Sequence, residues 1–306
     1  MKFIYSCDIH GDKEKYEELL ELAIKSECRN IVIAGDLLPK KGKDREKLQR
    51  EFIHGWFKDY LRRVNNSIVR FIAILGNDDA EAIEDDYNSM ISNYENVYNI
   101  DKTRVDIEDV SFIGLSEVLD TPFFRKNRIA VEEGMTYPIQ RHDQIEINKG
   151  RTLISKEEWE KYRSIHVPNM ADLLNALPEV KQGNKGIFVF HDPPYGIGLD
   201  MCKDGDVIGS REIANYISLK KPYMTLHGHV HESFEISGKW YEKIGETICM
   251  NCGQTEYEEK DLHFAMIDTI RNLFVRKTKK CNRDLERDYE WINLPNRKKC
   301  IIISKI

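Results

Sequence analysis

The sequence predicts an α/β protein in which short parallel strands alternate with helices. Short apolar runs alternate with longer segments whose apolar residues recur at helical spacing. This order is typical of βαβ units. Polar residues of metal-binding types follow several of the apolar runs. Open α/β sheets bind ligands outside the carboxyl ends of their strands, so these residues are expected to meet at one edge.

The N-terminal part of the chain contains three of these strands and two helices. In the segment 13–25, the residues Tyr16, Leu19, Leu20 and Ala23 share one helical face. The segment 44–64 shows a similar apolar side. The predicted strands cover residues 2–6, 30–34 and 70–75, and the predicted helices cover residues 13–25 and 44–64.

The pattern changes after the third strand. A β-hairpin is predicted over residues 104–115, with Glu108 and Asp109 in its turn. Residues 117–165 are polar and weakly periodic, and we interpret them as an inserted loop with one or two short helices. Beyond the insert, helices are predicted over residues 170–177 and 210–219, and strands over residues 185–190 and 223–227.

From Phe234 onward, the sequence predicts a β-meander. Its first hairpin is expected to turn at Ser237 and Gly238, because serine and glycine favour turns. We expect one domain over residues 1–277, with the tail 278–306 packing on it.

The overall charge limits the classes of partner. The 306 residues carry a net charge of −6, with 32% charged residues of both signs. An acidic balance argues against a nucleic-acid partner, because such binding depends on basic residues that neutralise phosphates. It does not exclude a small anionic substrate, since metal ions supply positive charge locally.

The cysteine pattern and the N-terminus indicate a compartment. The seven cysteines are odd in number and show no spacing typical of a disulfide framework. The N-terminal apolar run is broken by Asp8, and no apolar stretch reaches the length of a membrane span. We therefore expect a cytoplasmic protein with reduced thiols and no membrane partner.

Seven residues form a candidate set of metal ligands. Mixed imidazole and carboxylate ligands suit Mn, Fe and Zn, with Mg as a further option. Seven ligands are too many for one tetrahedral site and suit two divalent cations that share a carboxylate. The alternative for each residue alone is a polar cap or a core histidine, but the combination favours metal binding. The set is Asp8, His10, Asp36, Asn77, His191, His229 and His231.

These residues occur in an ordered series of motifs. The series is DIH at 8–10, GD at 35–36, GNDD at 76–79, the lone His191 and GHVH at 228–231. It resembles the calcineurin-like metallophosphoesterase family over residues 2 to 255. The stretches HDPPYG, VIGS, GHVHES and KIGETICMNCGQ resemble its Icc-like bacterial and archaeal branch. The resemblance implies a four-layer α/β/β/α sandwich of two stacked mixed β-sheets flanked by helices.

The resemblance also implies two groups of ligands that are joined by Asp36. Two cations about 3.5–4 Å apart lower the pKa of a bound water and clamp the phosphoryl oxygens. A metal-bridging hydroxide would then attack the phosphorus of a small phosphodiester or phosphomonoester. The first cation would be held by Asp8, His10 and His231, and the second by Asn77, His191 and His229. The catalytic residues would be Asp36, Asn77, Asp78 and His191.

One position departs from the family pattern. Asp78 stands where family members commonly carry a histidine that stabilises the transition state or protonates the leaving group. An ionised carboxylate there would repel phosphate, whereas a protonated one could donate. We therefore favour a phosphodiester or an activated aryl ester as substrate. Two alternatives are a metal-binding scaffold with little turnover and a nuclease, and the acidic charge counts against the nuclease.

Several cations near the motifs have two interpretations. Lys40 follows the GD motif and is a candidate for contact with an anionic substrate, although a solvated loop is the plainer interpretation. Arg125, Lys126 and Arg128 in the insert raise the same question.

Three further metal-capable residues are expected to be structural. His227 precedes the GHVH motif and should point away from it, as strand residues alternate in direction. Cys249 and Cys252 form a CxxC pair, but no second pair completes a zinc site.

Overall fold

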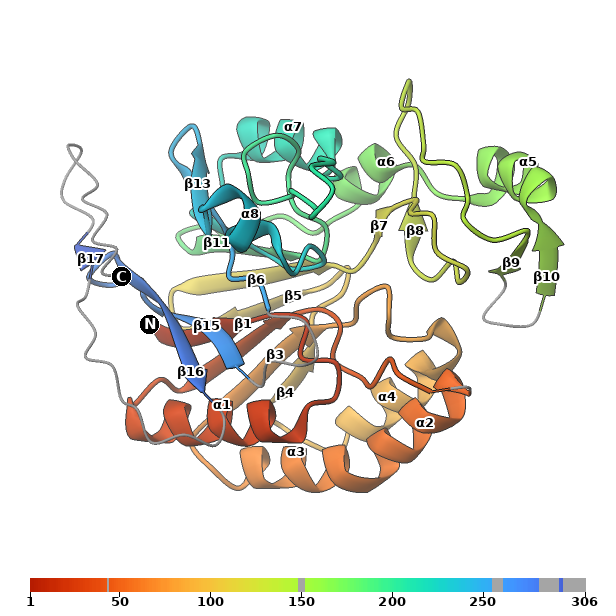
Figure 1. Ribbon diagram of the computed structural model, residues 1–306. Coiled ribbons are helices and arrows are strands. Elements are labelled where there is room, and N and C mark those ends of the chain that lie inside the picture. The colour runs from red at the N-terminus through yellow and green to blue at the C-terminus, as the bar shows by residue number, and fades with distance from the viewer. Residues whose placement is uncertain (43, 148–151, 255–260, 281–291, 294–306) are drawn as a thin grey trace.

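The computed structural model describes residues 1–42, 44–147, 152–254, 261–280 and 292–293 (Figure 1). Two β-sheets lie face to face with helices outside both of them. The expected four-layer α/β/β/α architecture is confirmed. Within the described residues, no helix has both the length and the apolar character that crossing a membrane requires.

The first sheet contains the three N-terminal strands in parallel, with an antiparallel extension on one side. Its strand order is β17-β16-β15-β1-β2-β3-β4. The bounds are β1 (Lys2–Ser6), β2 (Asn30–Ala34), β3 (Arg70–Ile74), β4 (Val97–Asn99), β15 (Asp261–Asp268), β16 (Leu273–Lys280) and β17 (Ile292–Asn293).

The second sheet has the order β13-β14-β12-β11-β6-β5, and its central strands are parallel. The predicted hairpin is confirmed, since β5 and β6 pair around a turn in which Glu108 has a φ of 54°. The bounds are β5 (Arg104–Ile107), β6 (Val110–Leu115), β11 (Lys185–Phe190), β12 (Met224–His227), β13 (Tyr241–Ile244) and β14 (Thr247–Asn251).

Alternating side chains on β1 divide between two apolar cores. Phe3 and Tyr5 enter the core between the sheets, whereas Ile4 faces the outer helices. This alternation follows from the two-residue period of a strand. Phe3 meets Phe112 of the second sheet edge to face, with ring centroids 5.9 Å apart. The core between the sheets therefore fixes how the two sheets face each other.

Helices cover the outer faces of both sheets. The helix α1 starts because Asp12 accepts hydrogen bonds from the N–H groups of Glu14 and Lys15, and it buries the predicted face. The helices over the first sheet are α1 (Lys13–Lys25), α2 (Arg45–Phe52), α3 (Lys58–Asn65) and α4 (Glu84–Ile91). The second sheet carries α6 (Met170–Asn175) and α7 (Arg211–Lys220), and α8 (Ser233–Ser237) follows β12.

The helix predicted over residues 44–64 is interrupted. A π-helical turn over Ile53–Phe57 separates α2 from α3, and inside it Gly55 has the non-helical angles φ −99° and ψ −111°. Glycine tolerates this geometry at little steric cost. Apolar residues recur at helical spacing on both sides of the turn. The sequence pattern therefore could not reveal the interruption.

The insert is more ordered than predicted. It contains two small sheets and an 11-residue helix instead of a loop with short helices. Strands of two to four residues are too short to show a period in the sequence. The elements are β7 (Val118–Leu119), β8 (Ile129–Ala130), β9 (Gln144–Ile147), β10 (Thr152–Ser155) and α5 (Lys156–His166).

The predicted C-terminal meander is wrong in two respects. The segment that begins at Phe234 forms the helix α8, which ends at Gly238 with a φ of 73°. In addition, β13 and β14 belong to the second sheet, while β15 and β16 belong to the first. Of the predicted tail, residues 278–280 continue β16 and residues 292–293 form β17. Its other residues lie outside the described part of the chain.

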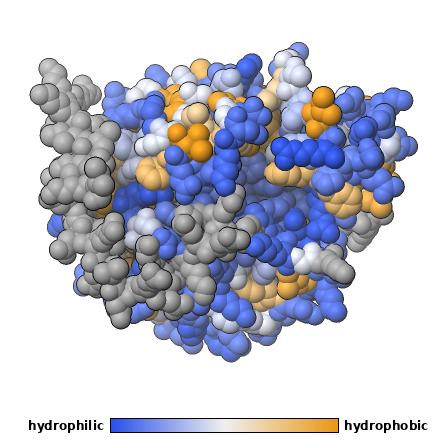
Figure 2. Space-filling view, in the orientation of Figure 1, coloured by the Kyte–Doolittle hydropathy of each residue, from blue (hydrophilic) through white to orange (hydrophobic). Residues whose placement is uncertain are grey.

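The face of the molecule in Figure 2 is mostly hydrophilic, with scattered apolar residues. Exposed apolar residues such as Ile139 and Ile165 lie on the insert. Single exposed apolar side chains are normal on protein surfaces.

A buried polar cluster holds the insert together. The carboxylate of Asp120 lies 2.8 Å from Lys126 Nζ and 2.7 Å from Arg163 Nη1, and it also accepts a hydrogen bond from Trp159 Nε1. The side chains of Asp120 and Lys126 are almost fully buried. Removing one partner of a buried ion pair leaves the other charge without compensation, which destabilises the fold.

We expect Asp120→Ala to lower the free energy of unfolding by about 3–5 kcal/mol, because it leaves the Lys126 ammonium buried without its carboxylate. Urea denaturation followed by circular dichroism measures this change. The control is Asp143→Ala, which removes the exposed partner of Lys156 and should leave the denaturation midpoint unchanged. Equal midpoints for wild type and Asp120→Ala would contradict the expected role of the cluster.

Candidate metal centre

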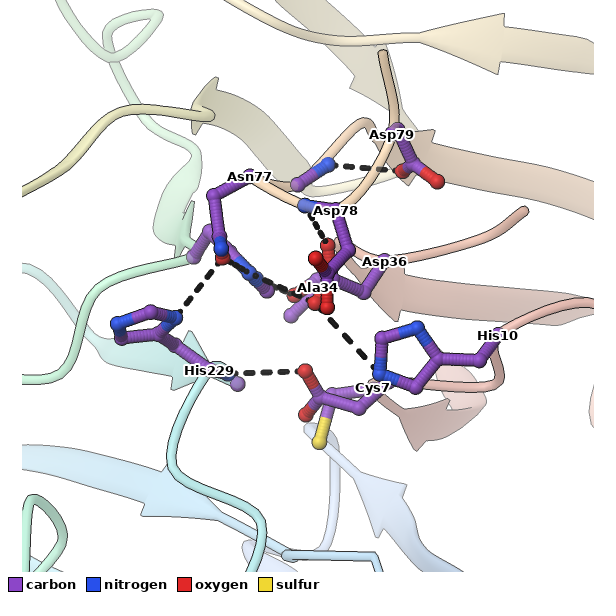
Figure 3. A network of polar contacts seen from close by, with 12 residues as sticks. Cys7, His10, Ala34, Asp36, Asn77, Asp78, Asp79 and His229 are labelled. Carbon is purple, nitrogen blue, oxygen red and sulfur yellow. Dashed lines mark hydrogen bonds and ion pairs between the residues drawn. The ribbon is translucent and has the colours of Figure 1, made fainter. Parts of the chain in front are cut away.

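The candidate site lies where strands of both sheets end (Figure 3). The first sheet contributes the loops after β1, β2 and β3, and the second sheet contributes the loops after β11 and β12. The structure brings all seven predicted residues together in this region. Their assignment as ligands stays a prediction.

The first group of side chains surrounds a small volume. Potential ligand atoms of Asp8, His10, Asp36 and His231 all lie within 4.8 Å of one another. His10 Nε2 lies 3.1 Å from His231 Nε2, and His231 Nε2 lies 3.3 Å from Asp8 Oδ1. Two imidazoles and two carboxylates that converge in this way suit a divalent cation of the Mn, Fe or Zn type.

The second group converges on the side-chain oxygen of Asn77. Asn77 Oδ1 lies 3.0 Å from His191 Nε2 and 2.9 Å from His229 Nδ1. Asp36 Oδ2 lies 3.5 Å from His191 Nε2 and 3.6 Å from His10 Nε2. The carboxylate of Asp36 therefore contacts both groups. The donor atoms present suit two cations that share this carboxylate.

The backbone of the site adopts left-handed angles that residues with side chains rarely take. The φ values are 53° for Asp8, 49° for His10, 54° for Asp36 and 67° for His229. Such residues cost about 1–3 kcal/mol each and cluster at functional sites. Hydrogen bonds hold them in place, including His10 N–H to Asp36 O at 2.8 Å and His229 N–H to Asp8 Oδ1 at 3.0 Å.

Two glycines allow the loops to approach each other. A Cβ atom on Gly35, whose φ is 91°, would lie 2.2 Å from His191 Nδ1. A Cβ atom on Gly76 would lie 2.3 Å from Asp36 Oδ1. Real Cβ atoms essentially never come this close to other heavy atoms, so both positions require glycine.

A hydrogen bond from the Nδ1 atom of His191 sets the orientation of its ring. His191 Nδ1 lies 2.8 Å from Ala34 O, and a carbonyl only accepts, so Nδ1 carries the proton. Nε2 therefore faces Asn77 and Asp36. Outer hydrogen bonds of this kind orient metal-binding histidines.

The charges in the site depend on one another. Burial lowers the pKa of His10 to about 3 and that of His229 to about 4, and neutral imidazole is the form that binds metals. Burial would also lower the pKa of His191, but the negative charge of Asp36 raises it to about 10. Burial opposes ionisation of Asp36, yet His191 and His10 hold its pKa well below the usual value. The carboxylate of Asp36 therefore favours positive charge next to it, at His191, while His10 and His229 stay neutral.

Comparison with known proteins identifies the family. A sequence model described as calcineurin-like phosphoesterase matches residues 1–233. The chain belongs to the calcineurin-like phosphoesterase family. Its members are phosphoesterases, and the family implies divalent metal ions. No curated protein sequence shows a significant match to the chain.

Solved structures of low sequence identity share the fold of this calcineurin-like chain. The protein TT1561 of Thermus thermophilus superposes with a TM-score of 0.53 at 17% identity, over 92% of this chain and 99% of that one. A dimetal phosphatase from Danio rerio gives a TM-score of 0.50 at 9% identity, over 93% and 98% of the two chains. At these identities the likeness concerns the fold alone.

Asp79, the acidic residue of the calcineurin-like GNDD motif, ties the loops together. Its carboxylate accepts hydrogen bonds from the N–H groups of Leu37, Leu38 and Gly76 at 2.7 to 2.9 Å. Burial and the nearby charge of Asp36 raise its pKa to about 7. The residue therefore orients the two loops that its carboxylate joins.

Asp78, which follows Asn77 in the GNDD motif, turns its side chain toward two cations. Its backbone N–H donates to Asp36 Oδ1 at 2.8 Å. Its carboxylate lies 2.9 Å from Arg45 Nη1 and 3.4 Å from Lys40 Nζ. The carboxylate is therefore ion-paired at the rim of the site.

The insert contributes contacts that sequence reasoning missed. Asn127 Nδ2 donates to Asn77 O at 3.3 Å, and Arg128 Nη1 donates to the carbonyls of Gly76 and Asp79. Both residues are buried, so they brace the GNDD loop. Neither residue lies in a motif or in a run of regularly spaced apolar residues. The basic side chain of Arg128 was the one feature of the sequence that pointed to a contact with this loop.

The two other candidate cations, Arg125 and Lys126, are engaged within the insert. Lys126 Nζ lies in the buried cluster around Asp120. Arg125 Nε lies 2.7 Å from Glu146 Oε1. Both therefore have structural partners there.

The structural interpretation of His227 and of the cysteine pair agrees with the contacts. His227 is buried, with Nδ1 2.9 Å from Asp192 O and Nε2 2.7 Å from Thr225 Oγ1. Cys252 Sγ lies 3.6 Å from Cys7 Sγ, and Cys249 is buried on β14. Among the described residues, the His, Cys, Asp and Glu side chains that lie close enough together to hold a metal ion are those of Asp8, His10, Asp36 and His231. The cysteine pair does not belong to this group.

We expect Gly35→Ala to abolish manganese binding, because the added methyl group displaces His191. The matched control is Gly183→Ala, since Gly183 has a nearly equal φ of 90° and nothing within 4 Å of the added Cβ. Titration calorimetry with Mn²⁺ measures binding, and circular dichroism verifies the fold. Equal manganese uptake by the two variants would contradict this expectation.

Proposed function

We propose that the chain is a dinuclear metal-dependent phosphoric ester hydrolase. The observation that carries this proposal is the carboxylate of Asp36, which lies within 3.6 Å of imidazole nitrogens from both groups. A shared carboxylate between two sets of donors suits two adjacent cations. Membership of the calcineurin-like phosphoesterase family supports the reaction class.

The proposed roles follow from the contacts of each residue. When bound, the two cations would supply Lewis acidity and would lower the pKa of water that attacks phosphorus. Asp36 would hold both cations, and Ala34 O would keep His191 Nε2 directed at the site. The first cation would be bound by Asp8, His10 and His231, and the second by Asn77, His191 and His229.

We propose a phosphodiester or an activated aryl ester as the substrate class. Asp78 supplies no imidazole at the position where relatives commonly carry one, and its carboxylate is occupied by Arg45 and Lys40. Loss of a positioned general acid costs about 10²–10⁴-fold in rate when the leaving group needs a proton. Esters with good leaving groups escape most of this cost.

We expect Asp36→Asn and Asn77→Ala each to reduce hydrolysis of bis-p-nitrophenyl phosphate with Mn²⁺ by at least about 10²-fold, the usual effect of removing one group that stabilises transition-state charge. The release of p-nitrophenolate measures the rate. His54→Ala is the control, because that exposed side chain lies on the outer helical layer. Activity that survives both site substitutions would exclude the mechanism.

A metal-binding scaffold is the second candidate, and Asp78 is the observation that favours it. A carboxylate in place of the usual imidazole is compatible with a site that binds cations but turns over slowly. Two manganese ions bound per chain, without hydrolysis of any monoester or diester in a broad panel, would support the scaffold over the hydrolase.

A further inference from the structure

The insert reaches the candidate metal centre through its two short strands β7 and β8. They pair in parallel, with Val118 opposite Ile129 and Leu119 opposite Ala130. Arg128, the residue before β8, has a left-handed φ of 49°. Such an angle costs energy in a residue with a side chain and persists only where the surroundings over-determine it. The contacts of Arg128 must therefore hold it in place.

Those contacts fasten the GNDD loop at both of its ends. Arg128 Nη1 donates to Gly76 O at 3.3 Å and also to Asp79 O. On its other side, Nη2 lies 3.0 Å from the carboxylate of Glu84, the first residue of α4. The backbone N–H of Arg128 donates to Glu81 Oε1 at 2.6 Å. One buried guanidinium thus joins the insert to the loop and to the helix that follows it.

The same pair of strands holds the backbone beside two candidate ligands of the second group. Asn127 Nδ2 donates to the carbonyl of Asn77 at 3.3 Å. The N–H of Leu119 in β7 donates to Asp192 Oδ2 at 3.0 Å. Asp192 directly follows His191, and both are fully buried. The insert therefore fixes the backbone at Asn77 and next to His191.

The other end of β8 is fixed to the outer helical layer of the second sheet. Glu132, two residues after β8, accepts hydrogen bonds from the N–H groups of Arg211 and Glu212 at 3.3 Å and 3.0 Å, and from the hydroxyl of Ser210. A carboxylate at a helix N-terminus satisfies N–H groups that have no partner within the helix. Because β8 is anchored at both ends, it can hold the GNDD loop in one position.

The first group is held by contacts within the first sheet. The N–H of Asp8 donates to Gly35 O at 3.1 Å, and the N–H of His10 donates to Asp36 O at 2.8 Å. The loops after β1 and β2 are therefore joined directly, and the two strands themselves pair in parallel. A change in the insert should act on the second group more than on the first.

We propose that β7 and β8 set the affinity for the second cation, with Asn127 and Arg128 as positioning residues for Asn77. The inference rests on the proposed function, because it takes Asn77, His191 and His229 as the ligands of that cation. Hydrogen bonds around a ligand fix its orientation, and the loss of such a partner typically costs about 10- to 100-fold in metal affinity. The insert thus decides whether the site holds one cation or two.

Titration of the full-length chain with Mn²⁺ tests this inference without turnover. We expect Arg128→Ala to weaken binding of the second manganese ion about 10- to 100-fold and to leave the first unchanged. Arg125→Ala is the matched control, because Arg125 pairs with Glu146 within the insert, and it should bind both ions as the wild type does. An unchanged second affinity in Arg128→Ala would overturn the proposal, and so would an equal loss at both ions.

Electron paramagnetic resonance separates positioning from a general loss of structure. Two manganese ions that share a carboxylate are magnetically coupled, whereas a single bound ion gives the spectrum of isolated Mn²⁺. With just enough manganese to fill both wild-type sites, we expect the coupled spectrum in the wild type and in Arg125→Ala. Arg128→Ala should give the isolated spectrum, and circular dichroism verifies its fold. A coupled spectrum of wild-type strength in Arg128→Ala would contradict the proposal.

A milder variant covers the case in which Arg128→Ala does not fold. Asn127→Ala removes one hydrogen bond to the loop, and we expect it to weaken the second manganese ion about 2- to 10-fold. An unchanged second affinity there would overturn the proposal as well.

The wild type and the variants report separately on the proposed function and on this inference. A wild-type chain that binds two manganese ions but hydrolyses no ester would refute the hydrolase, while a selective loss in Arg128→Ala would still support the role of the insert. An active chain whose Arg128→Ala and Asn127→Ala variants keep both ions with unchanged affinity would refute that role and leave the hydrolase standing.

Discussion

The position of the Asp36 carboxylate is the constraint on which the candidate site depends. It contacts His10, which follows β1 in the first sheet, and His191, which follows β11 in the second. One carboxylate can reach both histidines only if the two sheets keep a fixed spacing and orientation. The apolar core between the sheets, with Phe3 against Phe112, provides this fixed relation because close-packed interiors resist displacement.

The strained loops are a consequence of the same constraint. Left-handed angles at Asp8, His10, Asp36 and His229 aim the side chains at one volume. Such angles persist only where the surroundings over-determine them. Three features fix these angles here. They are the ends of the strands, the hydrogen bonds between the loops, and Gly35, which lets its loop approach His191 closely. The donor atoms are thus preorganised, which is what a catalytic metal site requires.

Much of the fold could be predicted because its regular elements have clear periods. The strands β1 and β2, the helix α1 and the hairpin of β5 and β6 lie where the sequence placed them. Prediction failed where an element is short or where tertiary contacts choose between structures. The strands of the insert are too short to show alternation, and the segment at Phe234 forms a helix although it was predicted as a strand.

The sequence by itself determined which candidate ligand residues are present and in what order, since each follows a predicted strand that is recognisable by its apolar residues. It also placed an acidic residue, Asp78, directly after Asn77. Only the tertiary structure decided what that carboxylate contacts. Its partner Arg45 lies 33 positions away in the chain, and Asn127 reaches the Asn77 loop from the insert across 50 positions. Contacts over such separations depend on how whole layers pack, and no local period or motif encodes them.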